Sequence, residues 1–381
     1  GVKKMKYKYP RIKPIYPLYQ LNKERFRVGA QLGITIEFDD DEGQFWTLSN
    51  LLDGVRSFDE VVTEMKRKYP ELTVKDIEEG IDFLNDEGLI EETFPGRMIE
   101  DRYLANVNYF SRYCKADDDR FEIQEKINNL KILLLGLGGG GSNILTLLAG
   151  LGPKMIRMVD YDRVEASNLG RQLLYREADI GEKKTVVAKR AINEMNSNIN
   201  VETVDKKIID VNDVVELTEG IDIIVCAIDE PPFLIHRIVN EAIVKVGLPC
   251  VFGASQVSRG RVYTVIPQKT GCFDCMNLNF SKNDPKFVEQ FVGFRNIQFA
   301  PPSIAYGPGI FQLTASIVDE LIRVVTRYAE PKSLGTQYEI NYEDGNSFTH
   351  KTWPRFESEC PTCGKGDVSQ WEIFQYYQEK K

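Results

Sequence analysis

Histidine is nearly absent from this chain of 381 residues, which has only two, His236 and His350. Histidine is the side chain that most often serves as a general base near neutral pH, so its scarcity argues against Ser-His-Asp or Cys-His catalysis. His236 falls in a predicted helix and His350 lies near the last predicted strands. We expect both histidines to be structural rather than catalytic.

Long apolar runs and an excess of positive charge are missing as well. No run approaches the ~20 apolar residues that a bilayer-spanning helix needs, and no charged-then-apolar signal sequence opens the chain. The formal net charge is -9, which leaves no surplus of cations to neutralise the phosphates of a nucleic acid. The sequence therefore predicts a cytoplasmic protein with neither a membrane nor a nucleic acid among its partners.

The first 95 residues differ from the rest of the chain in the size and order of their predicted elements. Short strands and helices are predicted in the order Ile12–Leu21, Phe26–Val28 and Leu32–Phe38 (strands), then Phe45–Leu52, Ser57–Tyr69 and Thr73–Asn85 (helices), then a strand after Gly88. The third helix opens with Thr73 and Asp76 at the spacing of a capping box and buries Ile77, Ile81 and Leu84. This order predicts a small winged-helix α+β domain over residues 1–95.

A break at Phe94-Pro-Gly96 separates this domain from the rest. We expect a linker helix region over residues 96–130, with a helix from about Asp101 to Cys114. A second domain then covers residues 131–381. With 42% hydrophobic residues, the chain can build a core in each domain.

A glycine-rich turn is the organising feature of the second domain. Leu133–Leu135 is a continuous apolar run, as in a strand buried on both faces of a parallel sheet. Gly136, Gly138, Gly139 and Gly141 follow and allow a tight turn into a helix that starts near Ser142. Free N–H groups and the positive end of the helix dipole at this point favour a phosphate, so a bound nucleotide is the first hypothesis.

Two carboxylates follow later strands of the same domain. Asp160 ends the apolar run Met155–Val159, where a carboxylate can accept hydrogen bonds from ribose hydroxyls, and Asp229 follows the strand Ile221–Cys226. Further predicted elements alternate: helix Lys184–Asn196, strand Val201–Val204, helix Phe233–Val246 and strand Cys250–Gly253. The pattern predicts an α/β, Rossmann-like, mostly parallel sheet with helices on both faces.

The glycine pattern alone does not separate ATP from NAD, because both cofactors use it. Asn168, Arg171 and Lys184 distinguish them, since an amide, a guanidinium and an ammonium suit a triphosphate with Mg²⁺ and serve no purpose in hydride transfer. Lys183 stands beside Lys184 and is an alternative to it. An NAD-linked oxidoreductase is the weaker reading.

Cys272-x-x-Cys275 and Cys360-x-x-Cys363 form the most specific motif in the chain. Two such pairs supply four thiolates for a tetrahedral Zn²⁺. With all four positions taken by sulfur, the ion has no place for a reacting water, so we predict a structural zinc site with four cysteine ligands. Cys226 and Cys250 lie in apolar strands and are predicted to be core residues.

Taken together, these residues resemble the ThiF/MoeB superfamily of ubiquitin-activating-enzyme-like adenylyltransferases, which join AMP to a carboxylate. The resemblance runs from about Arg102 to Gly364. Within the superfamily the chain is most similar to microcin C-type peptide adenylating enzymes, through three short segments and an N-terminal extension of similar length. The segments are Thr270-Gly-Cys-Phe-Asp-Cys275, Phe299-Ala-Pro301 and Tyr328-Ala-Glu-Pro-Lys-Ser-Leu334.

The resemblance implies a role for each motif residue. Asp160 would hold the ribose, Asp229 would hold Mg²⁺, and Arg171, Lys184 and Asp229 would be catalytic. The glycines would form the phosphate loop, while Asn168, Arg171 and Lys184 bind the triphosphate. A homodimer is also implied, and the apolar helix 308–328 is predicted to serve either the core or the dimer interface.

The chain departs from the superfamily at two points. The Arg-Tyr-x-Arg pattern, whose second arginine reaches a neighbouring subunit's ATP, here reads Arg102-Tyr-Leu-Ala105, so the trans contribution is in question; Arg102 or Arg112 are the available substitutes. The crossover segment Asn279–Ala305 has no cysteine, although sulfur-carrier and ubiquitin activators carry one there. Thioester transfer is therefore not expected.

Residues 1–95 resemble PqqD-like domains, which hold leader peptides by adding them as an extra strand. A purely structural or dimerisation domain and a DNA-binding winged helix are the alternatives, and the acidic Asp39-Asp-Asp-Glu42 argues against DNA. The sequence thus predicts an ATP-dependent adenylyltransferase that activates a carboxyl or amide group of a ribosomally made precursor peptide. Alternatives are pantocin-type cyclisation or dehydration of the peptide, and a non-catalytic peptide-presenting partner of a separate cyclodehydratase.

Overall fold

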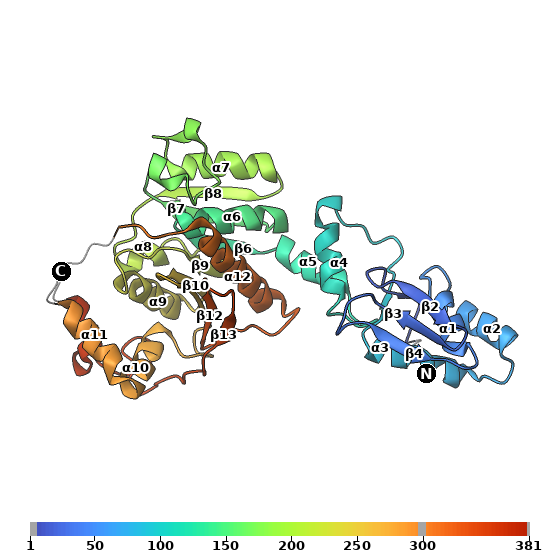
Figure 1. Ribbon diagram of the computed structural model, residues 1–381. Helices are drawn as coiled ribbons and strands as arrows, with labels where there is room; N and C mark the ends of the chain where they lie inside the picture. The colour runs from blue at the N-terminus through green and yellow to red at the C-terminus, as the bar shows by residue number, and fades with distance from the viewer. Residues whose placement is uncertain (1–5, 296–301, 379–381) are drawn as a thin grey trace. The chain divides into compact units, whose positions relative to one another are not determined.

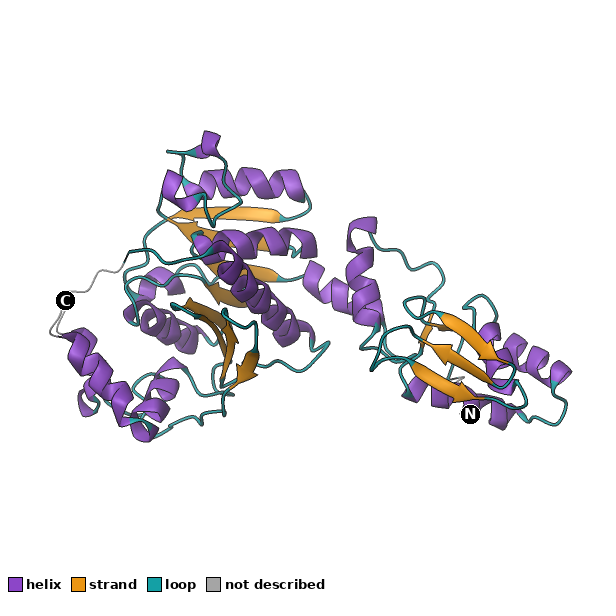
Figure 2. Ribbon diagram, in the orientation of Figure 1, coloured by secondary structure: helices purple, strands orange, loops and turns teal. Residues whose placement is uncertain are grey.

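Two units make up the chain, Gly1–Glu125 and Lys126–Lys381, and each has its own hydrophobic core. The computed structural model describes residues 6–295 and 302–378, so the Phe299–Pro301 segment lies outside the described residues. Figure 2 shows that the first unit combines antiparallel strands with helices, whereas the second is built on one large sheet. No helix of the described residues combines the length and apolar character needed to cross a bilayer.

The first unit contains two small antiparallel sheets and three consecutive helices (Figure 1). Strands β1 and β5 form one sheet, and β2, β3 and β4 form the other in that order. The elements are β1 (Pro10–Ile12), β2 (Leu18–Asn22), β3 (Arg25–Val28), β4 (Ile36–Asp39), α1 (Gln44–Leu51), α2 (Phe58–Lys68), α3 (Val74–Asp86) and β5 (Ile90–Glu92). A 3-10 turn (Asp101–Tyr103), α4 (Leu104–Ser111) and α5 (Arg120–Asn128) follow.

Two of the predicted strands of this unit are shorter than expected. The run 12–21 is two strands, β1 and β2, because Pro14 and Pro17 between them lack the N–H groups that a ladder needs. The run 32–38 becomes a strand only at Ile36. Before it, the Gln31 carbonyl accepts the N–H groups of Ile34 and Thr35 (3.1 and 2.9 Å) and closes a turn.

The helices of this unit begin where local capping predicts. The Thr73 side chain accepts the N–H of Asp76 (3.2 Å), and the Asp76 carboxylate accepts the N–H of Thr73 (2.8 Å), which confirms the capping box. Ile77, Ile81 and Leu84 are buried along one face of α3, as the 3.6-residue period requires. The core of the unit forms where this face meets the strands and the other helices.

The second unit is built on an eight-stranded sheet with strand order β13-β12-β11-β10-β9-β6-β7-β8. Neighbouring strands from β8 to β10 are parallel, and those from β10 to β13 are antiparallel. The parallel part of the sheet, from β8 to β10, was predicted. The strands are β6 (Lys131–Leu135), β7 (Met155–Asp160), β8 (Asn200–Asp205), β9 (Ile223–Cys226), β10 (Cys250–Ser255), β11 (Arg259–Val265), β12 (Gln337–Asn341) and β13 (Ser347–Thr349).

Helices cover both faces of this sheet (Figure 1). Alternate residues of the central strands, such as Leu133, Ile224 and Phe252, join a core with α8 and α9, while α6 and α12 pack together on the opposite face. The helices are α6 (Gly139–Leu151), α7 (Lys184–Met195), α8 (Val211–Val215), α9 (Leu234–Val246), α10 (Phe273–Asn283), α11 (Pro285–Arg295), α12 (Gly307–Thr326) and α13 (Glu372–Gln378). Short 3-10 turns lie at Ala166–Asn168, Glu177–Asp179 and Val368–Gln370.

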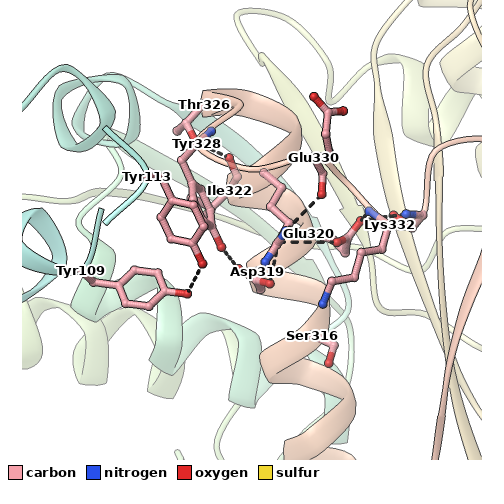
Figure 3. Close-up of polar contacts among 12 residues, drawn as sticks. Tyr109, Tyr113, Ser316, Asp319, Glu320, Ile322, Thr326, Tyr328, Glu330 and Lys332 are labelled. Carbon is pink, nitrogen blue, oxygen red and sulfur yellow. Dashed lines mark hydrogen bonds and ion pairs between the residues drawn. The ribbon is translucent and has the colours of Figure 1, made fainter. Parts of the chain in front are cut away.

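A buried carboxylate on α12 fixes the Tyr328–Leu334 segment (Figure 3). The Oε2 of Glu320 accepts the N–H groups of Lys332 and Ser333 (2.8 and 2.9 Å) and the Ser333 hydroxyl (2.6 Å). The Ser333 hydroxyl also lies 2.8 Å from that of Thr264 on β11. This segment, one of those that carry the family resemblance, is therefore a turn that joins α12 to the sheet.

The inner face of α12 packs on β10 and β11, which favours the core role for this helix.

Candidate functional site

The strand order reverses at β6, and the predicted nucleotide residues gather around this point. Strands β7 and β8 extend the sheet to one side of β6, while β9 and β10 extend it to the other. In open α/β sheets such a switch point leaves a crevice at the carboxyl ends of the strands. The glycine turn follows β6, Asp160 ends β7, and Asp229 follows β9, so all three lie at this crevice.

Two glycines of the turn are required by its geometry. Gly136 has a positive φ of 93°, and a Cβ there would meet the Ala227 carbonyl at 2.9 Å. A Cβ on Gly141 would lie 1.8 Å from the carbonyl oxygen of Gly136. Helix α6 begins at Gly139, three residues earlier than predicted, so Gly139 and Gly141 belong to its first turn. The glycine turn and the N-terminus of α6 therefore lie together at the switch point.

Gly141→Ala should disrupt this turn, whereas Gly138→Ala should not. The added methyl group at position 141 overlaps backbone atoms, and overpacking of this kind costs about 1–3 kcal/mol or more. At position 138 a Cβ meets nothing within 4 Å. We expect Gly141→Ala to lower the melting temperature and weaken ATP binding by at least tenfold in calorimetry. Equal melting temperatures of the two variants would contradict the clash.

Asp160 locks the glycine turn in addition to facing the crevice. Its Oδ2 accepts the N–H of Leu137 (2.7 Å), and its Oδ1 accepts the N–H of Asp162 (2.8 Å). A carboxylate has about four lone-pair positions, so these two hydrogen bonds leave acceptor capacity for ribose hydroxyls. The structure thus places Asp160 where the sequence predicted it and adds a role in holding the loop.

Arg171 lies over the start of α6. Its Nε is 3.4 Å from the position that a Cβ on Gly139 would occupy, and its Nη1 donates to the Ser167 carbonyl (3.0 Å). The Arg171 carbonyl accepts a hydrogen bond from Asn143 of α6 (3.2 Å), which fixes the segment against the helix. Asn168 is buried, and its Oδ1 accepts the N–H of Glu165. The guanidinium is thus next to the glycine turn, while the Asn168 amide shapes the loop that carries Arg171.

The structure distinguishes between the two adjacent lysines. Lys184 is only 4% exposed, and its Nζ lies 3.3 Å from Asp162, two residues beyond Asp160. Lys183 instead pairs with Asp205 at the end of β8. Lys184 is therefore the lysine held close to the Asp160 side of the crevice. Lys183 is held at the end of β8 by its ion pair with Asp205.

Asp229 lies on the segment that joins β9 to α9, and it is exposed. This segment meets the glycine turn directly, because a Cβ on Gly136 would lie 2.9 Å from the Ala227 carbonyl and 3.1 Å from the Ile228 side chain. An exposed carboxylate beside the glycine turn is a suitable ligand for Mg²⁺.

Tyr175 supports the site and was not predicted. Its hydroxyl donates to the carbonyl of Leu137 in the glycine turn (2.7 Å), and burial raises its pKa well above the usual value, so it keeps its proton. Leu137 is thereby held at both backbone groups, by Tyr175 and by Asp160. No local pattern marks this tyrosine, which lies 38 residues from its partner.

Neither substitute for the missing trans arginine is distinctive in the structure. Arg102 pairs with Glu100 (3.3 Å), and the Arg112 guanidinium lies over the rings of Tyr109 and Tyr113. Both side chains have local partners within the first unit. A contribution from either to a neighbouring subunit stays a prediction.

The four predicted zinc ligands converge. Their sulfur atoms lie within 4.8 Å of one another, with Cys272 3.5 Å from Cys360 and Cys275 3.3 Å from Cys363. Four thiolates at about 2.3 Å from one Zn²⁺ would be ~3.8 Å apart, so the cluster has the size of a tetrahedral zinc site. The N–H of Phe356 also points to the Cys275 sulfur (3.4 Å). Cys226 and Cys250 lie in the core, as predicted.

Helix α9 is attached to the first cysteine pair. The fully buried carboxylate of Asp274 accepts two hydrogen bonds from Arg237 of α9 (3.0 and 3.1 Å) and one from Thr362 (2.7 Å). The N–H of Phe273 donates to Asn240, also on α9 (2.8 Å). The Cys272–Cys275 turn is therefore held by α9, whose first turn lies beside the Asp229 segment.

The chain belongs to the ThiF family, which matches residues 103–362. A sulfur carrier protein adenylyltransferase from Thermus thermophilus is 29% identical over 286 residues, covering 70% of this chain and 97% of that protein. A SAMP-activating enzyme E1 from Haloferax volcanii is 27% identical over 273 residues, covering 71% of this chain and 94% of that protein.

The fold is similar to that of Escherichia coli MccB. The crystal structure of MccB with ATP has a TM-score of 0.75 and 23% identity, and the match covers 93% of this chain and 99% of MccB. Because the match includes both units of the chain, the N-terminal unit is part of the shared architecture. Another solved structure shows MccB, as a microcin C7 biosynthetic enzyme, in complex with N-formylated MccA.

Proposed function

We propose that this protein transfers the adenylyl group of ATP to a carboxyl or amide group of a ribosomally made precursor peptide. Its enzyme class is that of its family, an ATP-dependent adenylyltransferase of the ThiF/MoeB type. The observation that carries the proposal is the position of Arg171 over the first turn of α6, where a triphosphate would lie. The peptide substrate is supported by the likeness to MccB along both units.

Each site residue has a role in this reaction. The backbone of the glycine turn and α6 would bind phosphate oxygens, and Asp160 would accept from the ribose. Arg171 and Lys184 would neutralise charge as pyrophosphate leaves, with Asn168 shaping the loop between them. Asp229 would hold Mg²⁺, which supplies further charge neutralisation when bound. The four-cysteine cluster would hold a structural Zn²⁺.

The first unit offers a strand edge for the leader part of such a peptide. The N–H of Asp40 donates to the carbonyl of Glu24, just before β3 (2.7 Å), and the pairing alternates along the two strands. Glu37 and Asp39 must therefore direct their N–H and C=O groups away from β3. Since β4 is the last strand of its sheet, these groups are available to an added strand.

An aromatic cluster beside this edge provides a surface for apolar side chains of the leader. Phe38 of β4, Phe45 of α1 and Phe83 of α3 lie with their ring centroids about 6 Å apart. Phe83 is 46% exposed, so part of the cluster faces solvent. Backbone pairing would give the leader affinity, and this cluster would select its apolar residues.

Two proline variants test leader binding by β4. Asp39→Pro removes an outward N–H without touching the β3 ladder, and Gln20→Pro does the same at the opposite edge, on β2. The probe is a candidate precursor peptide taken from a short open reading frame next to the gene. We expect Asp39→Pro to weaken its binding by about tenfold in fluorescence anisotropy, because one backbone hydrogen bond is lost. Gln20→Pro and Asp39→Ala should bind normally.

The three variants also show which strand edge binds the leader, and a separate experiment tests the reaction. Loss of binding in Gln20→Pro alone would place the leader at β2. Normal binding in all three variants would rule out both edges of this sheet as the leader site. The reaction itself is tested by mass spectrometry of the peptide after incubation with ATP and Mg²⁺, where an added adenylyl group is expected. The homodimer stays a prediction.

A further inference from the structure

His236 reaches back from the first turn of α9 to the segment that carries Asp229. Its Nε2 lies 3.1 Å from the carbonyl oxygen of Ile228, the residue before Asp229. Its Nδ1 lies 2.8 Å from the hydroxyl of Tyr263 on β11. The imidazole is buried and packs against the rings of Phe252, Tyr263 and Phe273.

The contact with Ile228 determines which nitrogen carries the proton. A carbonyl oxygen can only accept, so Nε2 must be the protonated nitrogen that donates to Ile228. Nδ1 then accepts from the Tyr263 hydroxyl, whose pKa is raised well above its usual value by burial. Burial also lowers the pKa of His236 to about 4, which is consistent with a neutral ring. Two hydrogen bonds thus connect the Tyr263 hydroxyl, the His236 ring and the Ile228 carbonyl.

The Ile228 carbonyl is a point from which Asp229 can be oriented. The peptide group that contains this carbonyl continues into the Asp229 backbone, so fixing its plane limits the directions available to the carboxylate. The Cys226 thiol makes a longer contact with the same oxygen (3.8 Å). The Ile228 side chain also lies against Gly136, so a shift of Ile228 would change the packing of the glycine turn.

We propose that His236 is a positioning residue that orients Asp229 toward the metal and triphosphate through the hydrogen bond from its Nε2–H to Ile228. The inference rests on the proposed function, in which Asp229 is the Mg²⁺ ligand. The role needs a neutral ring with its proton on Nε2, and it involves no proton transfer. This explains why one of only two histidines in the chain is buried beside the nucleotide site without facing it.

The tautomer can be tested on the unaltered protein. With two histidines, ¹⁵N-histidine labelling gives two sets of ring signals, and His350→Gln removes one of them. At neutral pH the His236 ring should show a protonated Nε2 and a bare Nδ1. A proton on Nδ1 instead would overturn the proposal, whether or not any His236 variant folds.

Three variants then test the positioning itself. His236→Phe keeps ring volume and loses the donor, His236→Gln keeps a donor near the Nε2 position, and Tyr263→Phe leaves the Ile228 contact in place. Mn²⁺ binding in the presence of a non-hydrolysable ATP analogue is measured by electron paramagnetic resonance. We expect His236→Phe to weaken Mn²⁺ binding about tenfold, the effect of one lost hydrogen bond, and His236→Gln and Tyr263→Phe to stay within about twofold of the unaltered protein.

The outcomes separate this inference from the proposed function. If the unaltered protein binds no Mn²⁺ with the analogue, the proposed function fails. If it binds and a folded His236→Phe binds equally well, only the positioning role fails. If Tyr263→Phe weakens binding as much as His236→Phe, core packing rather than the Ile228 hydrogen bond is responsible, and the proposal is overturned.

Discussion

Replacement of Asp229 by alanine should give a folded protein that has lost about a thousandfold in Mg²⁺-dependent ATP turnover. The side chain is exposed at the carboxyl end of β9, so its removal leaves no cavity and should not unfold the second unit. Its carboxylate is proposed to hold the ion that neutralises charge on the triphosphate. A loss of about 4 kcal/mol of such stabilisation corresponds to a thousandfold in rate. Turnover is measured by pyrophosphate release at saturating Mg²⁺.

Glu230→Gln is the matched control for this substitution. Glu230 is the next residue and is likewise exposed, so it shares the local charge but is not assigned to the metal. The control should retain near-normal turnover. If Asp229→Ala is folded and equally active, or if the two variants fall together, the assignment of Asp229 is wrong.

Removal of one cysteine of the four-cysteine cluster should have the second largest effect. We expect about one zinc per chain in elemental analysis, and loss of that zinc in Cys360→Ser. A structural zinc contributes its binding free energy to folding, on the order of 10 kcal/mol for small zinc sites at neutral pH. The turn that contains Cys360 and Cys363 and the start of α10 should therefore lose protection in hydrogen exchange.

Cys114→Ser provides the control for the zinc experiment. Cys114 is a buried free cysteine of the first unit, outside the cluster. Its replacement should leave the zinc content unchanged. A zinc-free protein with full stability, or a Cys360→Ser variant that retains zinc, would contradict a structural metal.

The predictable features of this chain are those that short segments determine. The glycine turn requires positive φ at Gly136 and the absence of a Cβ at Gly141, and these demands are visible in the glycine spacing itself. The capping box of α3 lies within four residues, and its apolar period marks the buried face. Two Cys-x-x-Cys pairs predict one shared site, because a structural zinc ion binds four ligands.

Features that depend on distant partners were not predicted. Strand β11 begins with Arg259, Gly260 and Arg261 rather than with an apolar run, and its pairing with β10 and β12 makes that edge of the sheet antiparallel. The hydrogen bond from Tyr175 to Leu137 joins residues 38 positions apart, and the contact between Tyr263 and His236 joins residues 27 apart. No periodicity or spacing encodes such pairs, because the fold itself brings them together.

The open edge of β4 also bears on whether copies of this chain associate with one another. An unpaired strand edge can add a strand from any source, including a second copy of itself, and this is a common start of aggregation. Here the strand carries Glu37 and ends in the acidic run Asp39-Asp-Asp-Glu42. Two copies that paired along β4 would bring the carboxylates of both chains close together, and like charges on neighbouring strands destabilise a sheet. We therefore expect the exposed carboxylates of Asp39, Asp41 and Glu42 to disfavour self-association along β4.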